Sequence, residues 1–169
     1  MRLNKSQINK IKNKQVTFVK KFTTIEHVYD FNKISKLVDD YSLFVDSKAS
    51  TGEVFRTIWR LKEIDKVDTY LFMYKDFTTR LFKYVPESRD GVDLFFSFVT
   101  NTGIPHFDEE DVFLIGLYGK TIYRITHDNK DYEINSGDLL HIPKGTWHKA
   151  ISYGPRVVAS IGYYGGKST

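Results

Sequence analysis

Two histidines and one aspartate in the second half of the chain have the residue types and spacing of a metal-binding set. His106 and Asp108 are separated by one residue in the segment 103–108. On an extended strand, residues i and i+2 point to the same face, so both side chains can aim at one point. His148 follows the Pro-Lys-Gly turn at 143–145, where a new strand is expected to begin close by. Two imidazoles and one carboxylate on one side of a metal leave the opposite positions open. That arrangement suits non-haem Fe(II), which must also bind a co-substrate and O₂.

The other histidines and nearby acidic residues are given simpler roles. His27 is expected on a helix and His127 in an Asp-Asn turn, neither with a chemical function. His141 is expected to point inward as a core or pocket-wall residue. The acidic run 109–111 is expected to be solvated, although one of its carboxylates could compete with Asp108 as a ligand. Two alternatives stay open for the set itself, because a His-x-Asp pair can be a surface ion pair and a strand-end histidine can simply bond a carbonyl.

Composition limits what kind of metal site is available. The chain has 169 residues and no cysteine, which excludes disulfides, iron–sulfur clusters and thiolate zinc sites. Its length favours a single domain, and 41% apolar residues are too many for a disordered protein. No run approaches the roughly 18 apolar residues of a membrane span, and the start of the chain has no signal-peptide core. We therefore expect a cytoplasmic protein without a membrane partner.

The positive charge is concentrated at the start of the chain. Residues 1–21 carry seven Lys or Arg side chains and no Asp or Glu, so a net charge of +4 becomes −3 for the remainder. We interpret residues 1–22 as a basic, solvated arm ending in an edge strand at 15–22. The arm has no aromatic or arginine pattern for contacting bases, so nucleic acid is not an expected partner.

The elements that must position these residues are mostly strands. Helical spacing predicts helices near 25–41, after the candidate caps Thr23 and Thr24, and near 53–63. From residue 69 onward, β-branched and aromatic runs alternate with turn residues, among them the Asn-Thr-Gly turn at 101–103. Such spacing is typical of a sandwich or jelly roll. The predicted fold is thus mainly β with a few N-terminal helices, its strands lying at 69–74, 78–85, 92–100, 112–118, 120–126, 132–134, 139–142, 147–152 and 157–163.

Two segments taken together resemble a known family. GIPHFDEEDVFLIGLYGKTIYRI (103–125) followed by INSGDLLHIPKGTWHKA (134–150) resembles the two halves of a cupin barrel of the JmjC type. The likeness covers roughly residues 92–164 and is nearest to the ribosomal-protein hydroxylases and the related asparaginyl hydroxylase. It implies a double-stranded β-helix, with residues 23–169 forming a single cupin domain. It also implies Fe(II) held by His106, Asp108 and His148, with 2-oxoglutarate as co-substrate.

One position departs from the family pattern. The matching enzymes keep a Lys or Arg two residues after the hairpin glycine to hold the distal carboxylate of 2-oxoglutarate, and that position is Thr121 here. Another branch uses an arginine eight to ten residues after the second histidine, which corresponds to Arg156. We therefore expect Arg156, with the Thr121 hydroxyl, to bind this carboxylate, since a guanidinium offers it a bidentate fork. The alternative is a strand-end surface arginine.

The functional prediction is an Fe(II)- and 2-oxoglutarate-dependent oxygenase that uses O₂ to hydroxylate a protein side chain or a small molecule. A small metal-binding cupin without 2-oxoglutarate is the first alternative, supported by Thr121. A non-catalytic ligand-binding cupin is the second. A homodimer is left open.

Overall fold

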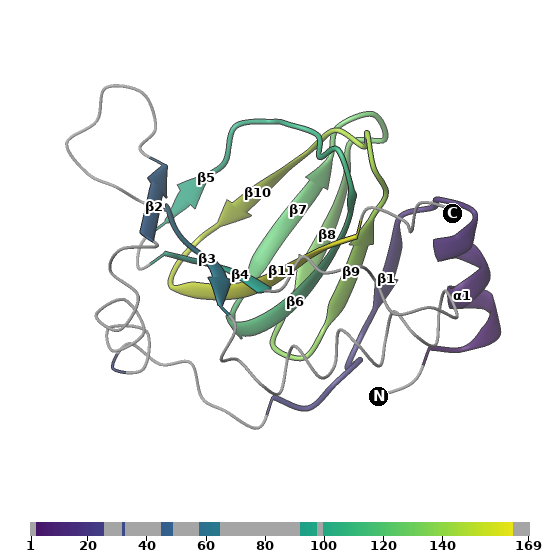
Figure 1. Ribbon diagram of the computed structural model, residues 1–169, viewed down its shortest axis with the longest axis horizontal. Helices are drawn as coiled ribbons and strands as arrows, with labels where there is room; N and C mark the ends of the chain where they lie inside the picture. The colour runs from purple at the N-terminus through teal and green to yellow at the C-terminus, as the bar shows by residue number, and fades with distance from the viewer. Residues whose placement is uncertain are drawn as a thin grey trace.

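The computed structural model describes residues 3–25, 32, 45–48, 58–64, 92–97 and 100–163. Within these ranges a single helix precedes a series of strands (Figure 1). In chain order the elements are α1 (Lys5–Lys12), β1 (Thr17–Val19), β2 (Val45–Lys48), β3 (Ile58–Ile64), β4 (Val92–Ser97), β5 (Asn101–Thr102), β6 (Asp111–Gly119), β7 (Thr121–Ile125), β8 (Lys130–Ile134), β9 (Leu139–Ile142), β10 (His148–Ser152) and β11 (Arg156–Tyr163).

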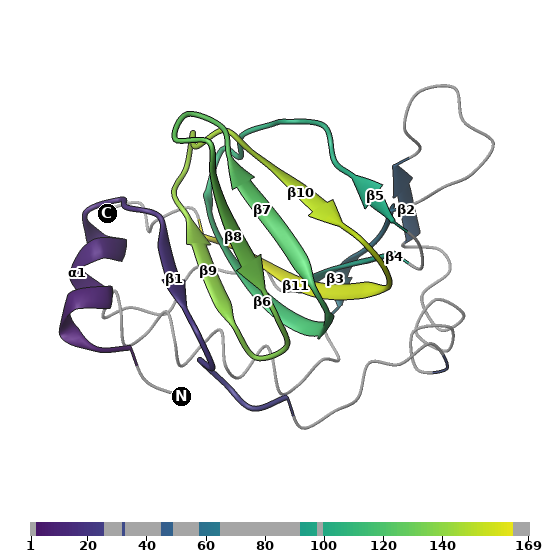
Figure 2. The same cartoon turned by 180° about the vertical axis from the view of Figure 1, so that it is seen from behind.

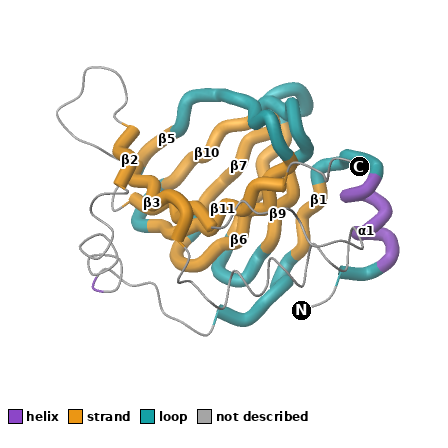
Figure 3. Tube along the Cα trace, in the orientation of Figure 1, coloured by secondary structure: helices purple, strands orange, loops and turns teal. Residues whose placement is uncertain are grey.

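The strands form two antiparallel sheets around one interior. The larger has the order β1-β9-β6-β11-β4-β3-β2 and the smaller the order β5-β10-β7-β8. Figures 1 and 2 show them from opposite sides, and Figure 3 distinguishes the strands from the helix and from the loops that connect them. The chain changes sheet between β4 and β5, β5 and β6, β6 and β7, β8 and β9, β9 and β10, and β10 and β11. This is the double-stranded β-helix, so the predicted mainly β jelly-roll fold is confirmed.

The core lies between the two sheets. On β7, Thr121, Tyr123 and Ile125 are buried while the residues between them are half-buried, which is the period of two expected for a strand with one face inward. Burying each large apolar side chain contributes about 1.5–3 kcal/mol relative to exposure. The central cluster draws on both sheets and consists of Val112, Leu114, Tyr123, Ile125, Ile134, Leu140, Ile142 and Val158.

The N-terminal segment is folded rather than a free arm. Asn4 and Gln7 form a capping box that starts α1, and Ile11 on this helix is buried. β1 then pairs with β9 at the edge of the larger sheet, which confirms the predicted edge strand. Residues 5–12 are thus helical rather than frayed, while Lys5, Lys10 and Lys12 remain exposed to solvent.

Two further predictions are corrected. The helix expected at 53–63 is contradicted by β3, which pairs with β2 and β4. The apolar and aromatic residues of this segment fit the period of a helix and that of a strand, and pairing with the neighbouring strands selects the strand. Asn101 and Thr102, expected in a turn, form the short strand β5 against β10. The helix predicted at 25–41 and the hairpin at 69–85 lie outside the described residues, apart from Ile25 and Asn32. No helix in the described residues is long and apolar enough to cross a membrane.

Candidate metal centre

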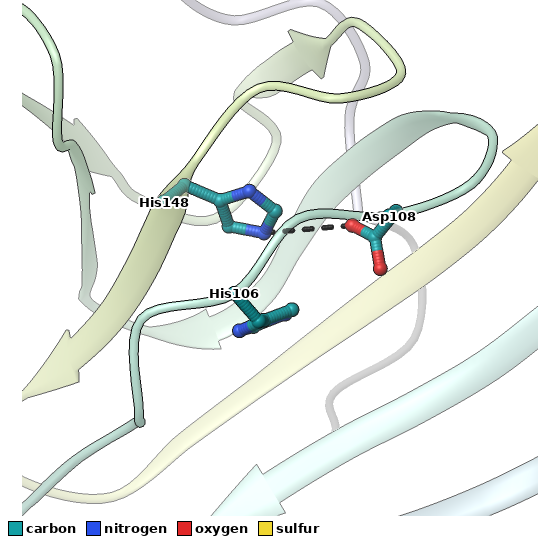
Figure 4. A group of neighbouring side chains, drawn as sticks. All are labelled: His106, Asp108 and His148. Atoms are coloured by element: carbon teal, nitrogen blue, oxygen red, sulfur yellow. Dashed lines mark ion pairs between the residues drawn. The ribbon is translucent and has the colours of Figure 1, made fainter.

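The three predicted ligands lie together where two crossings between the sheets meet (Figure 4). One ligand atom from each of His106, Asp108 and His148 lies within 4.8 Å of the others. His106 and His148 face each other across an isolated antiparallel bridge, in which His106 N–H donates to His148 C=O at 2.9 Å and His148 N–H donates to His106 C=O at 2.8 Å. Gly145 N–H donates to Asp108 C=O at 3.0 Å. Backbone hydrogen bonds therefore bring all three side chains to one point.

Both imidazoles are oriented by the carbonyl two residues before them. His106 Nδ1 lies 2.9 Å from Ile104 C=O, and His148 Nδ1 lies 2.9 Å from Thr146 C=O. A carbonyl only accepts, so each Nδ1 carries the proton and each Nε2 keeps a free lone pair. Metal-binding histidines are held in this way, with one nitrogen donating to a fixed acceptor. His148 Nε2 in turn lies 3.5 Å from Asp108 Oδ2, on the side where a shared ion would sit (Figure 4).

Burial and charge prepare His148 as a neutral ligand. Burial lowers the pKa of His148, and the nearby His106 ring lowers it further, while the Thr146 carbonyl and Asp108 oppose the shift. A neutral imidazole is the form that binds a metal, because the ligating nitrogen must be unprotonated. His106 is exposed and Asp108 is half-buried, so the same site is open to solvent on one side. The exposed rings of Phe107 and Trp147 meet edge-to-face beside it, with centroids 5.2 Å apart.

A buried arginine lies in the same barrel. Arg156 is 2% exposed, and its Nη1 donates to Thr121 Oγ1 at 3.4 Å. Among the described residues its Nε has no hydrogen-bond partner, and no carboxylate forms an ion pair with the guanidinium. The pairing of β11 with β6 places Arg156 opposite Gly119, next to the hairpin that begins β7. The structure thus brings together the two residues predicted to bind the co-substrate, and it excludes the surface alternative for Arg156.

Sequence reasoning missed two residues of this interior. Tyr123 lies between the two groups: its ring centroid is 6.3 Å from that of His148, and burial raises its pKa although the Arg156 guanidinium opposes the rise. Ser97 pairs with Arg156 in the strand register, and its buried hydroxyl has no partner among the described residues. Tyr123 could have been found, because it lies two residues after Thr121 and therefore on the same face of the strand. Ser97 could not, because its position depends on pairing between distant strands.

Of the remaining residues, His141 is fully buried, as predicted, but the acidic run is not uniformly solvated. Asp111 is 2% exposed and is enclosed by hydrogen bonds, which corrects that expectation. Glu109 is exposed and pairs with Lys144. His127 is exposed beside Asp128, and His27 lies outside the described residues.

The fold and the ligand set define a class. The double-stranded β-helix brings two histidines and one carboxylate together on neighbouring segments, and such a group can hold a metal ion with positions left open. No protein-family model and no curated protein matches the chain.

Solved structures do match. The Escherichia coli ribosomal oxygenase YcfD superposes with a TM-score of 0.70 at 19% identity, over 99% of this chain and 53% of that one. Its complex with cobalt and 2-oxoglutarate gives the same values, and its complex with cobalt and succinic acid gives a TM-score of 0.66 at 19% identity. The chain thus spans about half the length of these neighbours. The resemblance to JmjC-type cupins is confirmed at the level of the fold.

Proposed function

We propose that the protein is an Fe(II)- and 2-oxoglutarate-dependent oxygenase. The observation that carries this proposal is the pairing of two features in one barrel: a His-Asp-His set with two free Nε2 atoms, and a buried guanidinium that lacks a carboxylate partner among the described residues. The first suits a divalent metal with open positions. The second suits a dicarboxylate, because an unpaired buried cation is costly and an anion that pairs with it removes the cost.

Each group has a distinct task in this proposal. His106, Asp108 and His148 would hold the metal, which supplies the oxidative decarboxylation of 2-oxoglutarate and the insertion of one oxygen atom into a C–H bond. Arg156 would bind the distal carboxylate of 2-oxoglutarate, with the hydroxyls of Thr121 and Tyr123 as further donors. The apolar core between the sheets excludes water from the buried end of the co-substrate. The balanced reaction converts 2-oxoglutarate, O₂ and R–H into succinate, CO₂ and R–OH.

For the substrate we propose a protein side chain. The structural neighbours are named as ribosomal oxygenases, which makes a ribosomal protein the first candidate. His106 is exposed and is flanked by the exposed Phe107 and Trp147, so the site can be reached by a polypeptide from solution. A small molecule is the alternative substrate.

A second function is favoured by one observation. Thr121 occupies the position where the JmjC-type relatives carry a basic residue, so a metal cupin that does not use 2-oxoglutarate is the competing reading. The two functions differ in what the native protein binds.

Thermal unfolding separates them, because a ligand that binds only the native state raises the midpoint of unfolding. We expect Mn(II) alone to raise the midpoint, and 2-oxoglutarate to raise it further only when Mn(II) is present. The Fe(II)-loaded protein should then convert 2-oxoglutarate to succinate. A metal-dependent rise without any effect of 2-oxoglutarate would favour the metal cupin, and no effect of any divalent metal would contradict both functions.

A further inference from the structure

We infer that Asp111 is a positioning residue, which joins the two ligand-bearing loops to each other and to the N-terminal segment. The inference rests on the proposed function, because it treats those loops as the carriers of the metal ligands. Asp111 itself lies three residues beyond Asp108, at the start of β6.

The Asp111 carboxylate uses both oxygens at once. Oδ1 accepts from the backbone N–H of Lys144 at 3.0 Å. Oδ2 accepts from Lys14 Nζ at 2.7 Å and lies 3.1 Å from His141 Nε2. The side chain is 2% exposed, so these partners replace its hydration almost completely. A buried carboxylate with three donors is a rigid junction.

One side of this junction is the metal site. Lys144 lies in the turn 143–145 that leads into His148, while Asp111 ends the loop that carries His106 and Asp108. The same two loops are joined again by the hydrogen bond from Gly145 N–H to Asp108 C=O at 3.0 Å. Residues 104–107 and 144–145 are exposed, so little apolar packing fixes them. Their relative position therefore depends on a few hydrogen bonds, and the buried carboxylate of Asp111 accepts one of them.

The other side of the junction is the N-terminal segment. Lys14 follows α1 directly, and His141 Nδ1 lies 3.2 Å from the backbone carbonyl of Gln15. His141 is held in turn by stacking on Phe113, with ring centroids 4.8 Å apart and planes at 27°. The N-terminal segment thus contacts Asp111 directly through Lys14 and indirectly through His141.

This arrangement has a consequence for metal affinity. Ligands must be held within about 0.5 Å of their productive positions, and loss of a supporting group typically costs 10- to 100-fold in metal affinity. Asp111 contacts none of the three ligand side chains. It acts on the metal only by fixing the loops that carry them.

The test compares Asp111→Ala with a matched control, Asp138→Ala. Asp138 is also a buried carboxylate, and it also contacts the N-terminal segment: it accepts from Lys21 N–H at 2.8 Å and from Asn135 N–H at 3.0 Å. These contacts lie away from the ligand-bearing loops. Three measurements are made on the full chain: amide hydrogen exchange without metal, the Kd for Mn(II), and the visible absorption bands of the Co(II)-loaded protein.

For Asp111→Ala we expect faster exchange at the amides of His106, Gly145 and His148, a Kd for Mn(II) at least tenfold higher, and shifted Co(II) bands. Asp138→Ala should leave all three readouts unchanged. Unchanged exchange in Asp111→Ala, or equal changes in both variants, would overturn the inference. Faster exchange at these amides in a protein whose wild type binds no Mn(II) would support the positioning role and contradict the proposed function.

If Asp111→Ala does not fold, Lys14→Met tests the positioning role of Asp111 instead. The Lys14 side chain is 58% exposed, so its replacement carries little folding penalty. We expect a two- to threefold rise in the Kd for Mn(II) and faster exchange at the Lys144 amide. Wild-type values for both would overturn the inference.

Discussion

Replacing Arg156 should separate stability from co-substrate binding. Arg156 is 2% exposed, its Nε is unpaired among the described residues, and its Nη1 donates to the neutral Thr121 hydroxyl at 3.4 Å. A buried cation without an anionic partner costs free energy. Arg156→Met keeps much of the side-chain volume and removes the charge. Replacing buried ionic groups by apolar ones of similar size is neutral or stabilising by about 1–4 kcal/mol, so we expect an unfolding free energy at least equal to that of the wild type.

The same substitution should abolish tight binding of 2-oxoglutarate. Loss of one partner of a buried charge pair costs roughly 2–5 kcal/mol, which corresponds to a rise in Kd of about 30-fold to several thousand-fold. Thr121→Val serves as a graded control. It removes a neutral hydroxyl without changing the side-chain shape, for which a loss of about 0.5–1.5 kcal/mol is typical.

Calorimetric titration with 2-oxoglutarate in the presence of Mn(II), together with urea unfolding, measures both effects. Mn(II) affinity should stay the same in both variants, because neither residue belongs to the ligand set. Equal 2-oxoglutarate affinity in Arg156→Met and wild type would refute the assignment of Arg156. A large fall in the unfolding free energy of Arg156→Met would refute the view that this charge is retained for binding.

Four other substitutions have defined outcomes. His106→Ala or His148→Ala should abolish Mn(II) binding in titrations while leaving the circular dichroism spectrum unchanged; retained stoichiometric binding would show a structural role. Burial raises the pKa of Asp111, but hydrogen bonds from His141, Lys14 and the Lys144 amide outweigh it and lower the pKa from 3.8 to about 2. This ionised carboxylate stabilises the fold by about 2 kcal/mol above pH 4, and the contribution is lost as the pH falls through 2. Asp111→Asn should therefore lower the urea-unfolding free energy at pH 7 far more than at pH 2. An equal loss at both pH values would show that the ionised carboxylate does not stabilise the fold. Gly116→Ala would drive a Cβ into the Asn135 carbonyl and should cost about 1–3 kcal/mol in the same assay, whereas wild-type stability would show that the strand can move.

The strands from residue 111 onward could be predicted because their signals are local. β6 to β11 each combine alternating or continuous apolar residues with turn residues at both ends, and each predicted range overlaps the observed strand. β3 was not predictable in this way. Its run Ile58–Ile64 fits helix and strand periods alike, and only pairing with β2 and β4 selects the strand. α1 was missed because its apolar content is slight, although the Asn4–Gln7 capping box was a readable signal.

In the candidate site, too, local patterns could be predicted and contacts between distant segments could not. Placing His106 and Asp108 on one face required only that alternate residues of a strand point the same way. His148 could be placed at the start of a strand because a short turn motif precedes it. Placing Arg156 beside Thr121 required knowing that β11 pairs with β6 and β4, which no local pattern shows. Asp111 was misjudged for a related reason. A run of three acidic residues indicates solvent exposure. The burial of Asp111, however, depends on Lys14, which lies 97 positions away in the chain.

The central claim is that His106, Asp108 and His148 bind one metal with two positions left for 2-oxoglutarate. A crystal structure of the protein with Mn(II) and 2-oxoglutarate tests it most directly. We expect both Nε2 atoms and one Asp108 oxygen at about 2.0–2.3 Å from the ion. The 2-oxo group and adjacent carboxylate should chelate its open side, and the far carboxylate should lie against Arg156. Metal held by other residues, or three side chains pointing to separate places around an ion, would contradict the account.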